Sequence, residues 1–324
     1  MTTTQIDQLN ILLLVVAGGL SFYFPFEVFL FSFVVLGPLH YLTEISWLSK
    51  RDFFLQDSVG IKWLVALCTL SIICVYGFRW EQGMGILVGA ALIASVYFTY
   101  QSAWRYRFLV VAALVSLCML LSFQNWFVVF FALLLPTIIH TIIFTVFFML
   151  AGSIRSRSVW GFVATTLFLV ITIALVTVRI ASPYSTTAYA LNAINSTPNF
   201  TRLYELSHHI FFSQPFTVDG LFTTPAGWAI SRFIAFIYTY HYLNWFSKTT
   251  VIKWHDVPRE LLVFTIGIWL LSVALYSWRM VTGVNVLFYL ALLHAFLEFP
   301  LNIITIKNVV ASTFSIARKQ TPTS

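Results

Sequence analysis

The sequence has 324 residues, of which 60% are hydrophobic, 18% are aromatic and only 9% are charged. Soluble proteins carry about 25% charged residues, so this composition excludes an ordinary soluble domain and predicts an integral membrane protein. The apolar runs are continuous and do not alternate with a period of two, which predicts an all-α helical bundle and excludes a membrane β-barrel. The net charge of +7 does not indicate nucleic-acid binding, because the basic residues lie mostly in short loops and at the ends of apolar runs.

About ten membrane-spanning helices are predicted, which we interpret as one polytopic transmembrane domain over residues 1–324. The expected spans are 9–23, 26–48, 61–79, 84–103, 107–123, 125–151, 159–181, 226–247, 260–279 and 283–306. Most lysines and arginines follow the even-numbered spans. Since such residues concentrate on the cytoplasmic side, both termini are expected in the cytoplasm. Arg232 lies inside a span, and we expect its side chain to snorkel outward.

One connection, at 182–225, is much longer than the others and lies on the non-cytoplasmic side in this orientation. Its many aromatic residues predict a cap on the membrane surface, with a short amphipathic helix at 200–212. Loops of this length are usually functional or disordered. His208 and His209 in this connection, and His255 in a cytoplasmic loop, are expected to be solvated surface residues.

Two histidines inside apolar spans are each followed, four residues later, by a glutamate. These pairs are His40 with Glu44 and His294 with Glu298. Residues four apart lie on one face of a helix, so the two side chains of each pair can meet. An ionisable residue inside a bilayer costs roughly 2.5–3.5 kcal/mol to insert, which makes each of them a candidate functional residue.

Two further spans contain a lone histidine, so four spans carry one intramembrane histidine each. All four are even-numbered spans, which cross the membrane in the same direction. At 1.5 Å of rise per residue, their histidines fall in one layer between the midplane and the cytoplasmic interface. The matched depth predicts one buried polar site, formed by His40, His140, His241 and His294.

Neutral imidazole is the commonest protein metal ligand, so this layer is interpreted as a metal site. A mixed histidine and carboxylate set favours non-haem iron, while all-histidine sets also suit zinc or copper. Glu44 and Glu298 are the candidate catalytic residues, either as metal ligands or as acceptors that fix the tautomer of a histidine. Further polar residues are expected to support the ligands: Tyr41, Thr141, Asn244 and Asn302.

Other interpretations of the same residues remain open. A single intramembrane histidine often serves only as a hydrogen-bond partner between helices. The layer could also be the proton relay of a transporter, or the histidines could hold a haem for electron transfer. Phosphate-binding loops, H-E-x-x-H zinc motifs and nucleophile elbows are absent from the sequence, which argues against ATP-driven transport and soluble-type hydrolysis.

The sequence resembles bacterial membrane proteins of the Brp/Blh type, the β-carotene cleavage dioxygenases. The similar strings are Gly-Pro-Leu-His-Tyr-Leu-Thr-Glu-Ile-Ser-Trp at 37–47, Tyr-His-Tyr-Leu-Asn-Trp-Phe-Ser-Lys at 240–248 and Leu-His-Ala-Phe-Leu-Glu-Phe-Pro-Leu-Asn at 293–302. The resemblance implies a non-haem iron enzyme of the bacterial inner membrane that uses O₂ to cleave a carotenoid or another lipid-like apolar substrate taken from membrane lipids. This chain departs from the family in having glutamate where the family has a second histidine one turn away, so the iron ligands are expected to differ.

Overall fold

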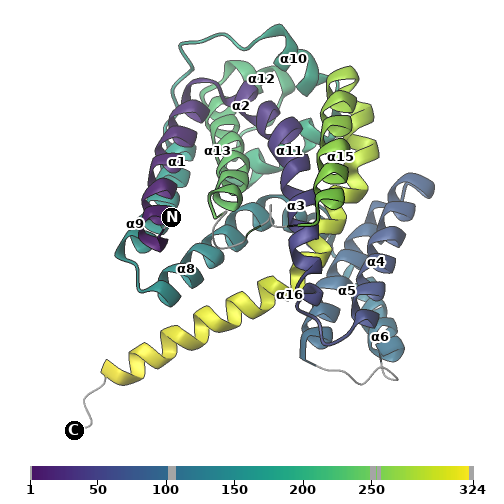
Figure 1. Cartoon of the computed structure of the whole chain (residues 1–324). Coiled ribbons are helices and arrows are strands. Elements are labelled where there is room, and N and C mark those ends of the chain that lie inside the picture. The colour runs from purple at the N-terminus through teal and green to yellow at the C-terminus, as the bar shows by residue number, and fades with distance from the viewer. Residues whose placement is uncertain (1, 101–106, 249–252, 254–256, 321–324) are drawn as a thin grey trace. The chain divides into compact units, whose positions relative to one another are not determined.

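The computed structural model describes residues 2–100, 107–248, 253 and 257–320, and every regular element in these residues is a helix (Figure 1). The predicted all-α fold is therefore confirmed. His255 and the last three residues of the predicted span 84–103 lie outside the described residues.

Eight helical segments in the described residues are long and apolar enough to cross a membrane, so the chain is a multi-pass membrane protein. They are Thr3–Tyr23, Pro25–Ser49, Ser58–Gly77, Glu81–Tyr100, Trp126–Ser156, Val159–Thr177, Arg259–Trp278 and Met280–Thr313. The other two predicted spans are also helical. The helix α6 (Arg107–Leu121) is short, and α13 (Pro225–Ser247) is long but contains many polar residues. The exact count of ten stays a prediction.

The described chain divides into two compact units. Unit 1 comprises Met1–His40 and Arg155–Leu287, and unit 2 comprises Tyr41–Ile154 and Phe288–Ser324. Three helices run from one unit into the other: α3 (Gly37–Ser49), α8 (Thr145–Ser156) and α16 (Met280–Gln320). The helix α3 thus contributes His40 to unit 1 and Glu44 to unit 2.

Unit 1 is built around α13, most of whose residues are buried. The helices α1 (Thr3–Tyr23), α2 (Pro25–Phe31) and α9 (Val159–Thr177) pack against it, and a π-helical turn, η1 (Ser32–Leu36), follows α2. The helix α15 (Arg259–Trp278) packs on η1. Thr224 begins α13, because its side chain accepts the Gly227 N–H and Pro225 follows at the first helical position, where its missing N–H costs nothing.

Arg232 does not snorkel outward as predicted, because its guanidinium is fully buried in unit 1. Its Nε donates to the Phe22 carbonyl at 2.9 Å, and its Nη1 donates to the Ile180 carbonyl at 2.5 Å. The guanidinium also lies 4.0 Å from the centre of the Phe22 ring. The first carbonyl belongs to the last turn of α1, where backbone acceptors have no partner within the helix and a positive charge is favourable. Arg232 therefore joins the ends of neighbouring segments.

Unit 2 is built around α5 (Glu81–Tyr100), which packs against α4 (Ser58–Ile72), α6 and the long π-helical segment η5 (Val129–Phe144). Short elements, η3 (Ile73–Gly77) and α7 (Asn125–Val128), lie at helix ends. Small residues on α5 permit close approach, since a Cβ added at Gly89 would lie 3.3 Å from Cys118 Sγ. Such small-residue contacts are typical of packed membrane helices. Phe296 and Phe299 of α16 belong to the same core.

The connection at 182–225 contains three helices: α10 (Ala188–Asn195), α11 (Pro198–Phe211) and α12 (Val218–Thr223). The predicted helix at 200–212 is confirmed as α11, which buries one stripe at a spacing of three and four residues: Phe200, Leu203, Tyr204, Ser207 and His208. His209 is exposed as predicted, whereas the prediction for His208 is wrong, because its side chain is buried against the Phe212 and Phe216 rings.

Candidate metal centre

Two of the candidate histidines lie in or shortly after π-helical segments. His40 follows η1 by four residues, and His140 lies inside η5 together with Pro136. Prolines at 38 and 136 lack the N–H that a regular α-helical ladder needs, which explains why the chain departs from α-helical geometry close to both histidines. π-helical turns are rare and occur frequently at functional sites, which fits two of the three π-helical segments in the described chain; the third, η3, contains no candidate residue.

In unit 1, His40 and His241 face each other. Their Nε2 atoms lie 3.1 Å apart, and the two rings meet edge to face with their centres 4.7 Å apart. Both side chains are buried, and the rings of Tyr242 and Trp245 lie 5.1 and 5.5 Å from that of His40. The surroundings of this pair are therefore aromatic and closely packed.

Unit 2 contains a second pair with the same arrangement. The Nε2 atoms of His140 and His294 lie 3.3 Å apart, and their rings meet edge to face at 5.1 Å. Both side chains are buried, and Tyr41 stacks on His294 with ring centres 6.0 Å apart. In each unit, two histidines that are more than 150 positions apart in the sequence thus approach each other through their Nε2 atoms.

Two buried carboxyl groups, those of Glu298 and Glu44, lie next to the histidine pair in unit 2. Oε2 of Glu298 lies 3.2 Å from Nδ1 of His140, and both side chains are almost fully buried. The two atoms are within ion-pair distance but not in the alignment of a hydrogen bond, so the contact is electrostatic and does not assign the tautomer of His140. Glu44 is also buried and is a hydrogen-bonding neighbour of Glu298. A hydrogen bond between two carboxyl groups requires a proton on one of them, so this group can store a proton.

The spacing of each histidine pair fits metal ligation. Two nitrogens that are each about 2.0–2.1 Å from one metal ion lie about 2.8–3.4 Å apart at coordination angles between square and tetrahedral. The observed separations of 3.1 and 3.3 Å fall in this range. A single Nε2–H···N hydrogen bond has a similar length, so metal content is the measurement that separates the two interpretations.

The four predicted supporting residues are all buried, but they differ in what they touch. Tyr41 contacts His294, as described above. The Thr141 hydroxyl donates to the Thr137 and Ile138 carbonyls of its own helix at 3.0 and 3.1 Å. It therefore provides a hydrogen-bond donor to backbone carbonyls of η5 and does not contact a candidate ligand through these bonds. Asn302 lies one turn beyond Glu298 on α16, and Asn244 lies one turn beyond His241 on α13.

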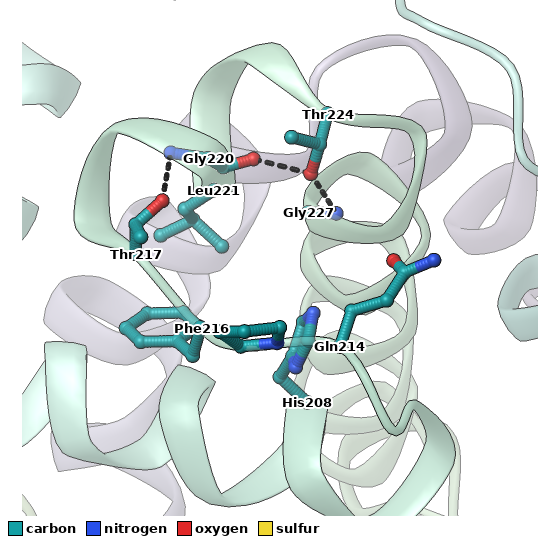
Figure 2. A pocket seen from close by; sticks show the side chains of 9 residues that line it. His208, Gln214, Phe216, Thr217, Gly220, Leu221, Thr224 and Gly227 are labelled. Carbon is teal, nitrogen blue, oxygen red and sulfur yellow. Dashed lines mark hydrogen bonds between the residues drawn. The ribbon is translucent and has the colours of Figure 1, made fainter.

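A cavity of about 50 Å³ lies in the cap of unit 1, away from the candidate ligands in sequence (Figure 2). It is lined by His208, Gln214, Pro215, Phe216, Thr217, Gly220, Leu221, Thr224 and Gly227. Figure 2 shows the hydroxyls of Thr217 and Thr224 bonded to the backbone of Gly220. The volume holds a few water molecules but not a lipid-like substrate.

Comparisons with known proteins add nothing to this description. No family model matches the sequence, and searches of curated proteins and of solved structures found no match either. The function must therefore be inferred from the residues and their geometry.

Proposed function

We propose that this protein is a membrane-embedded, metal-dependent oxygenase that acts with O₂ on an apolar, lipid-like substrate. The observation that carries the proposal is the approach of buried imidazole nitrogens to within 3.1 and 3.3 Å in two pairs. Buried polar groups inside a membrane protein are costly and are retained mainly for function. A pair of histidines poised at ligand spacing inside apolar surroundings is therefore better explained by a metal than by packing.

The ligands that we propose are His40 and His241 in unit 1 and His140 and His294 in unit 2. Glu298 would act on His140 by its charge from the Nδ1 side, and Glu44 would hold or release the proton that the two carboxyl groups share. Iron is the proposed metal because it suits mixed histidine and carboxylate surroundings, although zinc and copper also accept histidine sets. When bound, iron would supply the activation of O₂ for attack on an electron-rich double bond.

The protein would contribute burial, orientation and proton handling. Aromatic rings around His40 would exclude water from the pair in unit 1. An apolar substrate would enter from the lipid phase, since the eight apolar helical segments give the chain a membrane setting. A carotenoid is the substrate that we would test first, on the basis of the resemblance to the Brp/Blh type. The bacterial inner membrane with cytoplasmic termini is the proposed location.

One observation favours a second candidate function, a proton-coupled transporter. His140, Glu298 and Glu44 form a buried chain of groups that can pass a proton. Proton flux into liposomes that is lost in Glu44→Gln would support this candidate.

Haem ligation is disfavoured within either pair. Two nitrogens that bind one haem iron from opposite faces lie about 4 Å apart, because each Fe–N bond is roughly 2.0 Å long.

The deciding experiment is elemental analysis of the detergent-purified protein together with its optical spectrum. Iron bound in a fixed ratio, without a Soret band, would support the oxygenase, and O₂ consumption with a panel of carotenoids and lipids would then identify the substrate. The metal-to-protein ratio would also show whether the two histidine pairs act as one centre or as two. A protein that holds no metal after gentle purification would contradict the proposal and favour the transporter.

A further inference from the structure

A tryptophan in the middle of a membrane helix makes an unusual bond to the backbone near His40. Nε1 of Trp269 donates to the carbonyl of Val35 at 2.8 Å. Trp269 is the eleventh of the 20 residues of α15, far from the helix ends where membrane tryptophans usually lie. An indole N–H in the hydrocarbon layer needs an acceptor, and here the acceptor is a carbonyl of the π-helical turn η1.

The position of that carbonyl relates the bond to His40. Val35 belongs to η1, whose π-type bond from the Gly37 N–H to the Ser32 carbonyl closes the turn, and α3 with His40 follows η1 directly. The turn is also held from a second side, because the hydroxyls of Ser32 and Thr239 lie 2.7 Å apart. Thr239 lies two residues before His241 on α13. The turn that leads to one histidine is therefore bonded to α15 and to the helix that carries the other.

We propose that Trp269 is a positioning residue for His40. Its indole N–H holds the η1 turn, together with Thr239, so that Nε2 of His40 stays at ligand distance from Nε2 of His241. The inference rests on the proposed metal-binding function of these two histidines. Groups that orient a ligand without touching the metal typically change metal affinity by 10- to 100-fold when they are removed.

The test compares Trp269→Phe, which removes the N–H but keeps an aromatic ring, with Trp278→Phe at an exposed position of the same helix. Cobalt(II) is the probe, because its affinity and visible spectrum report both the strength and the geometry of the site. We expect Trp269→Phe to weaken cobalt binding at least tenfold and to shift the spectrum, while Trp278→Phe matches the wild type. Equal affinity and an unchanged spectrum in Trp269→Phe would overturn the inference.

Two additions keep the test decisive. If Trp269→Phe does not fold, Thr239→Val removes the hydrogen bond to Ser32 of the same turn and should also shift the cobalt spectrum. If the wild type binds no cobalt, the proposed function fails separately, and nitrogen-15 NMR of labelled histidines tests the positioning directly. The Nε2 signal of His40, assigned from its loss in His40→Gln, should then move in Trp269→Phe but not in Trp278→Phe. An unmoved signal would overturn the inference.

Discussion

Oε2 of Glu298 lies 3.2 Å from Nδ1 of His140, a residue on a different helix and 158 positions earlier in the sequence. The two nitrogens of this imidazole therefore face different neighbours. The carboxylate lies on the Nδ1 side of the ring, and Nε2 lies 3.3 Å from Nε2 of His294. The proposed role of His140 as a metal ligand therefore depends on the charge that Glu298 places beside its ring.

Replacing Glu298 by Gln should weaken metal binding about 10- to 100-fold, because the amide has nearly the same shape but removes the negative charge beside the His140 ring. Affinity is measured by competition with a coloured chelator in detergent. The matched control is Glu205→Gln, since Glu205 is an exposed glutamate of α11. Wild-type affinity in Glu298→Gln would show that the carboxylate has no part in the site.

Replacing His40 or His241 by Gln should abolish metal binding at the pair in unit 1, because each change removes one of two facing nitrogens. The bound metal per protein is measured by elemental analysis after desalting. His209→Gln is the control, since that imidazole is more than half exposed. A full complement of metal in both variants would contradict the assignment of this pair as ligands.

Replacing Arg232 by Met should destabilise unit 1 by about 2–4 kcal/mol, because two charge-assisted hydrogen bonds of a buried side chain are lost. The thermal midpoint in detergent measures the effect. Arg157→Met, at an exposed position, should leave the midpoint unchanged. If Arg232→Met melts like the wild type, its two bonds contribute nothing net to stability.

The helices and the burial of the four histidines could be predicted from the sequence, because apolar segment length and isolated ionisable residues are local signals. The pairing could not be predicted. Depth along a span indicates that His40 and His241 lie in similar layers, but the rotation of each helix decides which nitrogen meets which. Glu298 illustrates the limit, since the spacing pointed to a histidine one turn away while the structure places its carboxylate beside His140.

The π-helical turns also escaped prediction, although the prolines near His40 and His140 were the signal that could have found them. Hydropathy does not register the one extra residue in such a turn. Arg232 was misjudged for a related reason, because the carbonyls that it binds come from the ends of other segments, at Phe22 and Ile180. Burial of His208 depends likewise on the Phe212 and Phe216 rings that pack on it.

His208 should make the stability of the cap depend on pH. Burial lowers the pKa of His208 below its ordinary value of 6.5, and neighbouring His209 lowers that pKa further. The fold therefore favours neutral His208, and below about pH 6.5 the unfolded chain binds more protons than the folded chain. The stabilisation is complete above pH 6.5 and declines as the pH falls toward the lowered pKa.

Thermal midpoints in detergent at pH 8 and pH 5 measure this decline. We expect His208→Gln to lose less stability between the two values than the wild type, because the variant has no imidazole to protonate in the buried position. His209→Gln should retain most of the decline, since that exposed side chain is solvated in both states. If His208→Gln shows the same decline as the wild type, the acid sensitivity arises from other groups, and burial of His208 does not penalise its protonation.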